Sequence, residues 1–417
     1  MTAAADRATA DVITSAVAAE RAGMVATLIR LTGDWDLAED CVQDAIERAL
    51  VRWPQEGMPR SPVGWLTTVA RNRALDVLRR RRTERATLQQ RAILDEIGSD
   101  GGQPAGGSDD RLRLIFTCCH PALALDSRVA LTLKTVAGLS TGQIARAFLV
   151  SEPAMSQRLL RTKQKISHAA IPYRVPPDEL LAERTDGVLA VLYLIFNAGY
   201  GQPEDHLAVE ALRLARLLVD LMPEDDEARG LLALITFQMA RRPTRFDARG
   251  DLAPMEEQDR SRWDAALIEQ GEWQLRRAGR SGRRPGAYRL QARIAACHAT
   301  AATAAATDWD AIVTLYDALL AVQPSPVIAL NRAIAVGFRN GYQAGLAELD
   351  ALDTAALAGY YLLPAARADL LRRLGRGDEA RQAYYAALCL TSDGQPEQRL
   401  LQRRLTELDF CQITPAE

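Results

Sequence analysis

Two stretches of this sequence carry side chains that suit nucleic acid, and the first is rich in arginine. Residues 65–85, WLTTVARNRALDVLRRRRTER, hold seven arginines together with Trp65 and Asn72. The guanidinium fork of arginine matches phosphate oxygens and guanine edges, and an asparagine amide can pair with an adenine edge. Apolar residues recur in this run at helical spacing, so one helix would bury one face and offer a basic face. Taken alone, the run is also compatible with a basic face that meets only water.

The second stretch, residues 138–166, has the layout of a helix-turn-helix. Ser151 is the predicted N-cap of its second helix, and Pro153 falls in the first turn, where a missing N–H costs least. Met155, Leu159 and Ile166 are expected to face inward. The polar positions of the second helix are Gln157, Arg158, Arg161, Lys163 and Lys165. A helical hairpin of a repeat protein could have similar spacing, but a basic second helix favours the major groove of DNA.

A helix of opposite character is predicted just before the arginine-rich run. Residues 34–50 place apolar side chains on one stripe, and we expect Asp36 to cap this helix with Glu39 completing a capping box. Its polar face is formed by Glu39, Asp40, Gln43, Asp44 and Glu47. This surface is too acidic to lie on DNA, so it would contact water or a basic protein. Between the two helices, residues 52–65 contain three prolines and two glycines and predict an irregular loop, which could receive a flipped base.

Length and charge indicate several domains with different partners. A chain of 417 residues suggests two or three domains at roughly 150 residues each. Residues 1–170 hold 23 basic and 19 acidic side chains, whereas residues 171–417 hold 28 and 34. A basic first part suits nucleic acid, and an acidic remainder suits protein or water. Six scattered cysteines without a CxxC pair, and no export signal or membrane-length apolar run, predict a soluble cytoplasmic protein.

The predicted fold class is all-α, with two small helical domains followed by a helical repeat domain. Almost every long segment repeats apolar residues at spacings of three and four, and strand-like alternation is nearly absent. The Gly-, Ser- and Asp-rich stretch 99–110 predicts flexibility, and three prolines within 171–180 mark a second junction. The expected domains are 12–85, a flexible linker 86–108, a helix-turn-helix domain 109–168, and a C-terminal domain 180–417.

The order of these segments resembles the extracytoplasmic-function class of bacterial RNA polymerase sigma factors. The carriers of the resemblance are DLAEDCVQDAIERAL, WLTTVARNRALDVLRRRR and LSTGQIARAFLVSEPAMSQRLLRTKQKI. The resemblance implies sigma domain two in 12–85 and sigma domain four in 109–168. It further implies that the chain binds core RNA polymerase and promoter DNA, with two DNA readers joined by a flexible linker.

The same resemblance implies roles for individual residues. Core polymerase would be bound through Glu39, Asp40, Gln43 and Asp44. The −10 promoter element would be held and opened by Trp65, Arg71, Asn72, Asp76, Arg79 and Arg80. The −35 element would be contacted by Arg146, Glu152, Ser156, Gln157, Arg158, Arg161 and Lys165. Within this last set, Arg146, Arg158 and Lys165 could mainly hold phosphates.

The C-terminal part has the pattern of degenerate tetratricopeptide repeats. Residues 366–390 show the small-large alternation of such a repeat, and residues 308–326 offer a related helix. Tyr316 and Tyr384 are 68 residues apart, twice the usual period of about 34. An intermediate unit at 341–352 supports two to three repeats, whose concave surface would bind a helix or peptide.

Residues 188–201 and 256–268 resemble the C-terminal extension of one sigma-factor subgroup. In that subgroup the extension stands in for a separate anti-sigma protein, which implies contact between the C-terminal domain and the sigma domains. Asn197, in the FNAGY segment, is expected to be a helix C-cap beside core aromatic residues.

An enzyme is not expected. Cys118, Cys119 and His120 are adjacent, but neighbouring residues of a helix rarely face one point, and no CxxC or HxxxH pattern accompanies them. We therefore expect no catalytic residue, metal or cofactor. Two other functions remain open: a helix-turn-helix regulator that binds operators without polymerase, and a repeat scaffold whose basic helices are incidental. The acidic helix discriminates against the regulator, because only a polymerase-binding protein needs that face.

Overall fold

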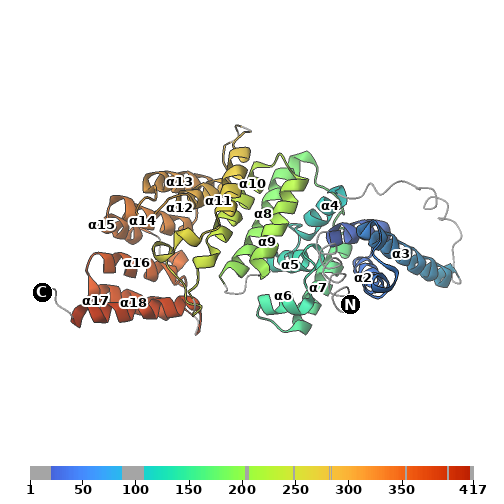
Figure 1. Ribbon diagram of the computed structural model, residues 1–417, viewed down its shortest axis with the longest axis horizontal. Coiled ribbons are helices and arrows are strands. Elements are labelled where there is room, and N and C mark those ends of the chain that lie inside the picture. Colours follow the sequence, from blue (N-terminus) through green and yellow to red (C-terminus); the bar gives the residue numbers. More distant parts are fainter. Residues whose placement is uncertain are drawn as a thin grey trace. The chain divides into compact units, whose positions relative to one another are not determined.

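The computed structural model describes residues 20–86, 108–201, 206–247, 249–280, 282, 284–352, 355–391 and 394–413. Within these residues the regular secondary structure is helical, with one isolated β-bridge between Phe246 and Leu252 and no strand, so the predicted all-α class is confirmed (Figure 1). The predicted linker 86–108 lies outside the described residues apart from its two ends, as do residues 12–19 of the first predicted domain. None of the described helices is long and apolar enough to cross a membrane.

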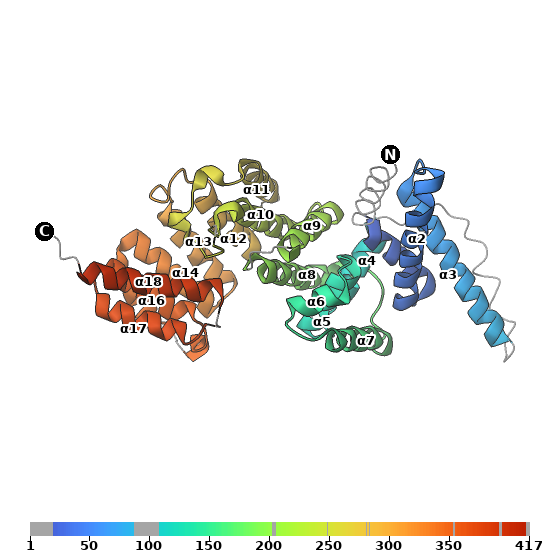
Figure 2. The ribbon, with the colours of Figure 1, turned by 60° about the horizontal axis from the view of Figure 1, so that its bottom comes forward.

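The chain divides into two compact units, residues 1–198 and residues 199–417. The first unit begins with the helical segment 20–32. It continues with α2 (Trp35–Glu56), α3 (Pro62–Ala86), α4 (Ser108–Cys118), α5 (Leu125–Leu131), the π-helical turn η1 (Thr132–Val136), α6 (Thr141–Ala147), α7 (Glu152–His168) and most of α8 (Asp178–Tyr200). Helices α2 and α3 pack against each other, and the C-terminal part of α3 extends beyond α2 (Figure 2).

The second unit is a series of helices in which neighbours along the chain pack together. Its α-helices are α9 (His206–Leu221), α10 (Asp226–Ala240), α11 (Ala265–Ala278), α12 (Ala287–Ala299), α13 (Trp309–Val322), α14 (Pro326–Asn340), α15 (Tyr342–Asp350), α16 (Leu362–Arg373), α17 (Gly377–Leu388) and α18 (Pro396–Ile413). Short 3₁₀ turns are η2 (Arg242–Thr244), η3 (Met255–Glu257), η4 (Arg260–Arg262) and η5 (Ala355–Leu357).

Helix starts follow the capping residues in the sequence, with one correction. Ser151 caps α7 by accepting a hydrogen bond from the Ala154 amide, as predicted. The N-cap of α2 is Asp34, whose side chain accepts from the Leu37 amide, so the prediction for Asp36 was wrong. Asp36 instead lies in the first turn, where its charge still suits the positive end of the helix dipole.

The junctions around α2 and α8 also differ from the sequence prediction. Helix α2 runs through Pro54 to Glu56, and α3 begins at Pro62, so the predicted irregular loop 52–65 shrinks to residues 57–61. Gly57 ends α2 with a φ of 85°, a backbone conformation that glycine adopts without strain. Helix α8 continues to Tyr200, so Asn197 lies inside it and is not a C-cap.

The last six helices carry the periodicity that predicted repeats. Leu315 on α13 and Leu349 on α15 are both buried, and Tyr316 and Tyr384 lie on α13 and α17. Helices α14 and α15 approach very closely at Gly337 and Gly345. A Cβ atom added to Gly345 would lie only 2.6 Å from Gly337 Cα. Glycine at this contact therefore sets the spacing of two consecutive helices.

Candidate nucleic-acid interface and acidic surface

Helix α3 separates a buried stripe from an exposed polar face. Leu66, Ala70 and Ala74 are fully buried against the rest of the first unit. Among the residues of α3 up to Arg80, whose side chains the structure describes, the exposed polar ones are Thr68, Arg71, Asn72, Asp76, Arg79 and Arg80. Helical spacing therefore gathers five of the six predicted −10 residues on the accessible side of one rigid element, where cations and an amide can meet phosphates and bases.

Trp65, the sixth predicted residue, is half-buried at the start of this face. Its ring lies 5.5 Å from that of Trp53 on α2, in an edge-to-face arrangement of 68°. Trp53 is buried, so it fixes the orientation of Trp65 beside the short loop 57–61. The pair joins the end of α2 to the beginning of α3.

The acidic surface of α2, defined as Glu39, Asp40, Gln43 and Asp44, is only partly open. Asp40 and Gln43 are exposed, whereas Glu39 and Asp44 are half-buried and paired. Partial burial, together with the charges of Asp36, Glu39 and Asp44, raises the pKa of Asp40. The carboxylates on this surface therefore repel one another, and a cationic partner would reduce that repulsion.

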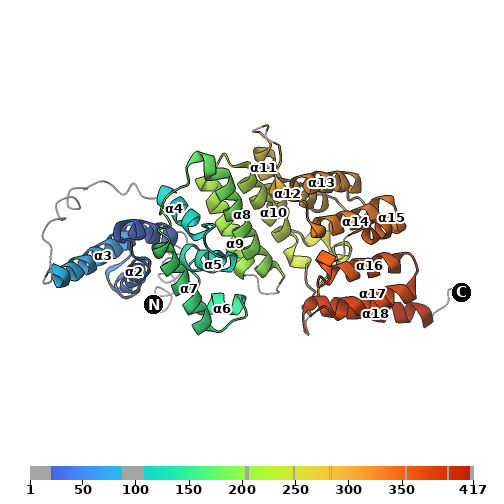
Figure 3. The ribbon, with the colours of Figure 1, turned by 180° about the vertical axis from the view of Figure 1, so that it is seen from behind.

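Helices α6 and α7 form the predicted helix-turn-helix (Figure 3). Ser140 and Gln143 form a capping box at the start of α6, and Leu149 adopts a φ of 52° in the turn. Met155, Leu159 and Ile166 of α7 are buried, as predicted. Their burial turns the opposite side of α7 outward, in the manner of a helix that reads a groove.

A groove of about 390 Å³ runs along the outward side of α7. Its lining combines Gln157, Arg158, Arg161 and Lys165 with residues of the segment 123–127. The other three predicted −35 residues, Arg146, Glu152 and Ser156, are exposed outside this lining. Four of the seven predicted −35 residues therefore line one groove, which we call the grouped part, and the other three lie outside it.

Arg158 is the one member of the grouped part that is not fully exposed. Its guanidinium lies 5.5 Å from the centre of the Phe148 ring and 3.8 Å from the carboxylate of Asp126. These two neighbours orient the side chain along the groove.

Lys163 lies on α7 but belongs to a different surface. Its Nζ is 2.7 Å from Asp36 Oδ1 and 3.1 Å from Glu39 Oε2, so it contacts the start of α2. Sequence reasoning placed it only among the polar positions of α7. No local signal could have found this contact, because the two helices are more than a hundred residues apart in the sequence.

Cys118 and Cys119 are part of the core, whereas His120 is half-buried. Both thiols are buried, and burial raises the pKa of Cys118 well above its usual range and that of Cys119 to about 11. Thiols in this state are poor nucleophiles at neutral pH. Within the described ranges, no group of three or more His, Cys, Asp or Glu side chains could hold a metal ion.

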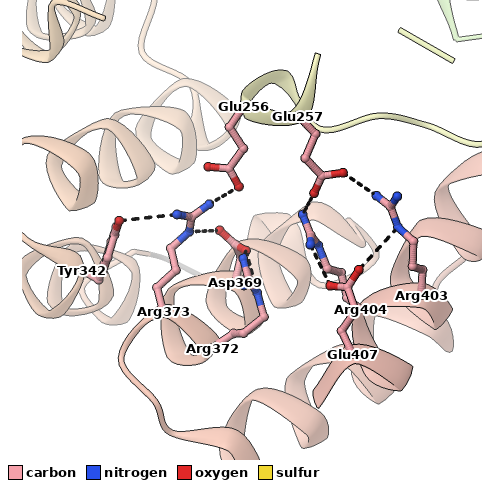
Figure 4. A network of polar contacts seen from close by, with 9 residues as sticks. All are labelled: Glu256, Glu257, Tyr342, Asp369, Arg372, Arg373, Arg403, Arg404 and Glu407. Carbon is pink, nitrogen blue, oxygen red and sulfur yellow. Dashed lines mark hydrogen bonds and ion pairs between the residues drawn. The ribbon is translucent and has the colours of Figure 1, made fainter. Parts of the chain in front are cut away.

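The second unit contains a polar network that sequence reasoning missed. Glu256 and Glu257, in the turn η3, pair with arginines of α16 and α18 (Figure 4). Arg373 reaches Glu256 at 2.5 Å and Asp369 at 2.7 Å, while Glu257 pairs with Arg403 and Arg404. This turn borders a cavity of about 740 Å³.

Aromatic residues from α13 to α15 form one wall of that cavity. The rings of Trp309 and Phe338 stack at 4.4 Å, Tyr342 meets Phe338 edge-on, and Arg373 lies 5.0 Å from the Phe338 ring centre. Glu256 and Arg373, beside this wall, are 117 residues apart in the sequence, and the charge patterns of the single helices did not indicate their pairing.

Three family models match separate parts of the chain. The model described as Sigma-70 region 2 matches residues 17–84, and Sigma-70, region 4 matches residues 113–166. A family of unknown function, DUF6596, matches residues 184–279. We use region 2 and region 4 below for the first two ranges.

Among curated proteins, the chain is 41% identical over 413 residues to an uncharacterized protein from Rhizobium meliloti, covering 96% of this chain and 97% of that protein. It is 30% identical over 137 residues to the ECF RNA polymerase sigma factor SigL from Mycobacterium tuberculosis, covering 31% of this chain and 73% of SigL. A match to the probable ECF RNA polymerase sigma factor SigI of the same species is 29% identical over 178 residues, covering 40% of this chain and 58% of SigI. No solved structure matches the chain.

Proposed function

Since the chain belongs to the family of extracytoplasmic-function RNA polymerase sigma factors, we propose that it binds core RNA polymerase and directs it to promoters as an alternative sigma factor. The observation that supports this proposal most strongly is that one chain combines an exposed basic face on α3, a groove lined by basic residues on α7 and an acidic surface on α2. An operator-binding regulator would use the basic faces but has no use for the acidic surface.

Each surface has a distinct role in this proposal. The acidic surface, with Asp40 and Gln43 at its open end, binds core polymerase. Trp65, Arg71, Asn72, Asp76, Arg79 and Arg80 of α3 hold and open the −10 element. The −35 element is bound by Arg146, Glu152, Ser156, Gln157, Arg158, Arg161 and Lys165.

The mechanism is recruitment rather than catalysis. Two DNA readers on one chain, both attached to polymerase, raise each other's effective concentration at a promoter. The chain needs no metal or cofactor for this, and it would act in the cytoplasm, where polymerase and promoters meet.

The second unit is proposed to regulate the sigma domains. The periodicity of the sequence over its last six helices supports tetratricopeptide-like repeats, and such repeats would present a concave surface for a helix or peptide. We assign it to the sigma-factor subgroup with a C-terminal repeat extension, acting through contact with regions 2 and 4 or with polymerase.

Polymerase binding is tested by titrating the full chain against purified bacterial core polymerase. Asp40→Lys should weaken binding at least tenfold, because it reverses the charge at the open end of the acidic surface. Glu56→Lys, at the exposed far end of the same helix, serves as the matched control and should bind normally. Equal affinity of both variants would remove the acidic surface from the proposal.

Regulation is tested by comparing the full chain with a chain that stops after Gly201. This end keeps α8, whose Arg184 donates to the Phe116 carbonyl of α4 at 2.7 Å. Transcription that changes in either direction on truncation supports regulation by the second unit. Identical transcription from both chains would contradict it.

A further inference from the structure

The second unit contains a cavity of about 740 Å³ to which the sigma-factor role gives no task. Its lining comes from the segments 254–260 and 304–307 and from each of the helices α12 to α18, so the whole cavity lies within residues 199–417. Sites for small organic molecules usually have volumes of about 300–1,000 Å³. The cavity is therefore large enough for a molecule of several rings.

Aromatic rings from three helices give the cavity a rigid wall. Trp309 and Phe338 stack with their planes 9° apart, and Tyr342 meets Phe338 edge-on. Tyr316 and Tyr384 line the cavity as well. Aromatic side chains contact a flat ring system through offset stacking and edge-to-face contacts. The wall therefore favours a ligand whose body is aromatic.

The charged side chains of the lining already have partners in the protein. Arg373 pairs with Glu256 and Asp369, and Arg404 pairs with two glutamates that lie outside the lining (Figure 4). Arg260 donates to the backbone carbonyls of residues 298 and 301, at 2.6 and 2.8 Å. An anion in the cavity would meet two carboxylates, and a cation would meet three guanidinium groups. The lining therefore favours an uncharged ligand, because a buried charge needs a partner of its own.

Two uncharged polar side chains of the lining are available for hydrogen bonds to a ligand. The amide of Asn331 and the imidazole of His298 have no hydrogen-bond partner among the residues that the structure describes. The His298 ring lies 5.3 Å from that of Trp309, next to the aromatic wall. Burial is the main cause that lowers the pKa of His298 to about 4, so its ring is neutral at pH 7. Each side chain thus offers both a donor and an acceptor.

Helix α14 places a polar and an aromatic part of the lining on the same face. Asn331, Ile334, Ala335 and Phe338 all line the cavity, and their spacing is that of one helix face. Asn331 and Phe338 are seven residues apart, or about 10 Å along the helix axis at 1.5 Å per residue. A ligand that contacts both side chains therefore needs the length of about two or three rings.

We propose that the cavity is a binding site for a small uncharged molecule of two or three aromatic rings, which packs against Trp309 and Phe338 and hydrogen-bonds to Asn331. His298 supplies a second neutral hydrogen-bonding group beside the rings. This inference goes beyond the proposed function, because the site lies in the second unit alone and requires neither polymerase nor DNA.

The test titrates the full chain with two fluorescent probes that share one ring skeleton. N-phenyl-1-naphthylamine is uncharged, has a fused ring pair, a separate ring and an N–H, and becomes brighter in apolar surroundings. Its 8-sulfonate carries the same rings and a negative charge. We expect the uncharged probe to bind at a single site per chain. The sulfonate should bind at least about tenfold more weakly, because it brings an unpaired charge into the cavity.

Two variants locate the binding site. Ala365→Phe adds a ring to the lining on α16 and should weaken binding of the uncharged probe at least about tenfold by occupying its space. Asn331→Leu keeps the size of the side chain but removes the amide, and should weaken binding about fivefold through the lost hydrogen bond. Ala386→Phe adds the same ring at an exposed position of α17, outside the lining, and should bind as the unchanged chain does. Circular dichroism and thermal unfolding show whether each variant is folded.

The outcomes separate this site from other apolar surfaces of the chain. Preference for the uncharged probe, with weaker binding by either folded variant and an unchanged control, supports the proposal. Absence of binding by the unchanged chain, equal affinity for the two probes, or unaltered binding by both variants would each overturn it. The sigma-factor assignment stands in every case, because polymerase and promoter DNA take no part in the assay.

Discussion

Arg73 Nε lies 2.8 Å from Asp44 Oδ2, and this ion pair joins the basic helix α3 to the acidic helix α2. This pair distinguishes Arg73 from the arginines of α3 that face solvent. Arg73 is half-buried and stabilises region 2, whereas Arg71, Arg79 and Arg80 are exposed. Asp44 is likewise held by its own chain, which leaves Asp40 and Gln43 as the open part of the acidic surface.

Arg73→Ala should therefore change the stability of the first unit, whereas Arg71→Ala should change DNA binding. Loss of the Arg73–Asp44 pair, whose side chains are 35% and 37% exposed, should lower the free energy of unfolding of the first unit by at most about 1 kcal/mol. Arg71→Ala should leave stability unchanged and reduce the salt dependence of promoter binding by about one phosphate contact. Urea unfolding and salt titration of the polymerase–promoter complex measure the two effects. Equal effects of both variants on DNA binding would contradict a structural role for Arg73 and a DNA-binding role for Arg71.

In the proposed contact with the −35 element, Gln157 reads a base and Lys165 holds a phosphate. Gln157→Ala should lose about 1–3 kcal/mol of discrimination at one base pair of the −35 element. Lys165→Ala should weaken all promoters alike and lower the salt slope by about 1. Binding to a set of single-substitution promoters measures both. A Lys165 variant with altered sequence preference would contradict this assignment.

The cap of α7 predicts a local stability effect. Ser151→Ala removes the hydrogen bond that the Ser151 hydroxyl oxygen accepts from the Ala154 amide and should destabilise the helix-turn-helix by about 1 kcal/mol. Ser167→Ala, exposed near the other end of α7, is the matched control and should have little effect. Hydrogen exchange of the α7 amides reports the difference. Equal protection in both variants would show that the cap contributes nothing.

His298 gives the second unit a defined pH dependence. Burial, together with the charges of Arg241 and Arg260, lowers the pKa of His298 to about 4 from 6.5. The unfolded chain therefore binds the proton more readily, and stability should fall as pH drops from about 6.5 towards 4, by up to roughly 3 kcal/mol.

His298→Asn should remove this part of the pH dependence. The variant and the unchanged chain should differ in the acid slope of unfolding of the second unit, and this slope should be shallower in the variant. Measurements above pH 7.5, where His298 is neutral in both states, give the reference for packing effects of the substitution. An unchanged acid slope would show that His298 does not titrate as its burial requires.

Features that depend on a single helix could be predicted from the sequence. The buried stripe of α7, the exposed face of α3 and the cap at Ser151 follow from spacing and side-chain type within a single segment. The choice of Asp34 over Asp36 did not, because aspartate is a good cap at either position and residue type alone does not distinguish them.

Contacts between distant segments could not be predicted. Lys163 has the same basic character as its exposed neighbours Arg161 and Lys165 on α7, and only the packing of region 4 on the start of α2 brings it to Glu39. The pairing of Glu256 with Arg373 is of the same kind. The length of the loop 57–61 was overestimated because α2 accommodates Pro54, with Trp53 buried, and continues to Glu56.

The most direct test of the sigma-factor assignment is in vitro transcription with purified core polymerase and genomic promoter fragments, with start sites mapped. The unchanged chain should create start sites that core polymerase alone does not use, and Asn72→Ala and Arg158→Ala should abolish them. Start sites that persist in both variants would contradict the promoter-reading roles and favour a repeat scaffold. Absence of any start site and of any complex with core polymerase, with operator DNA still bound, would contradict the assignment itself and favour a helix-turn-helix regulator.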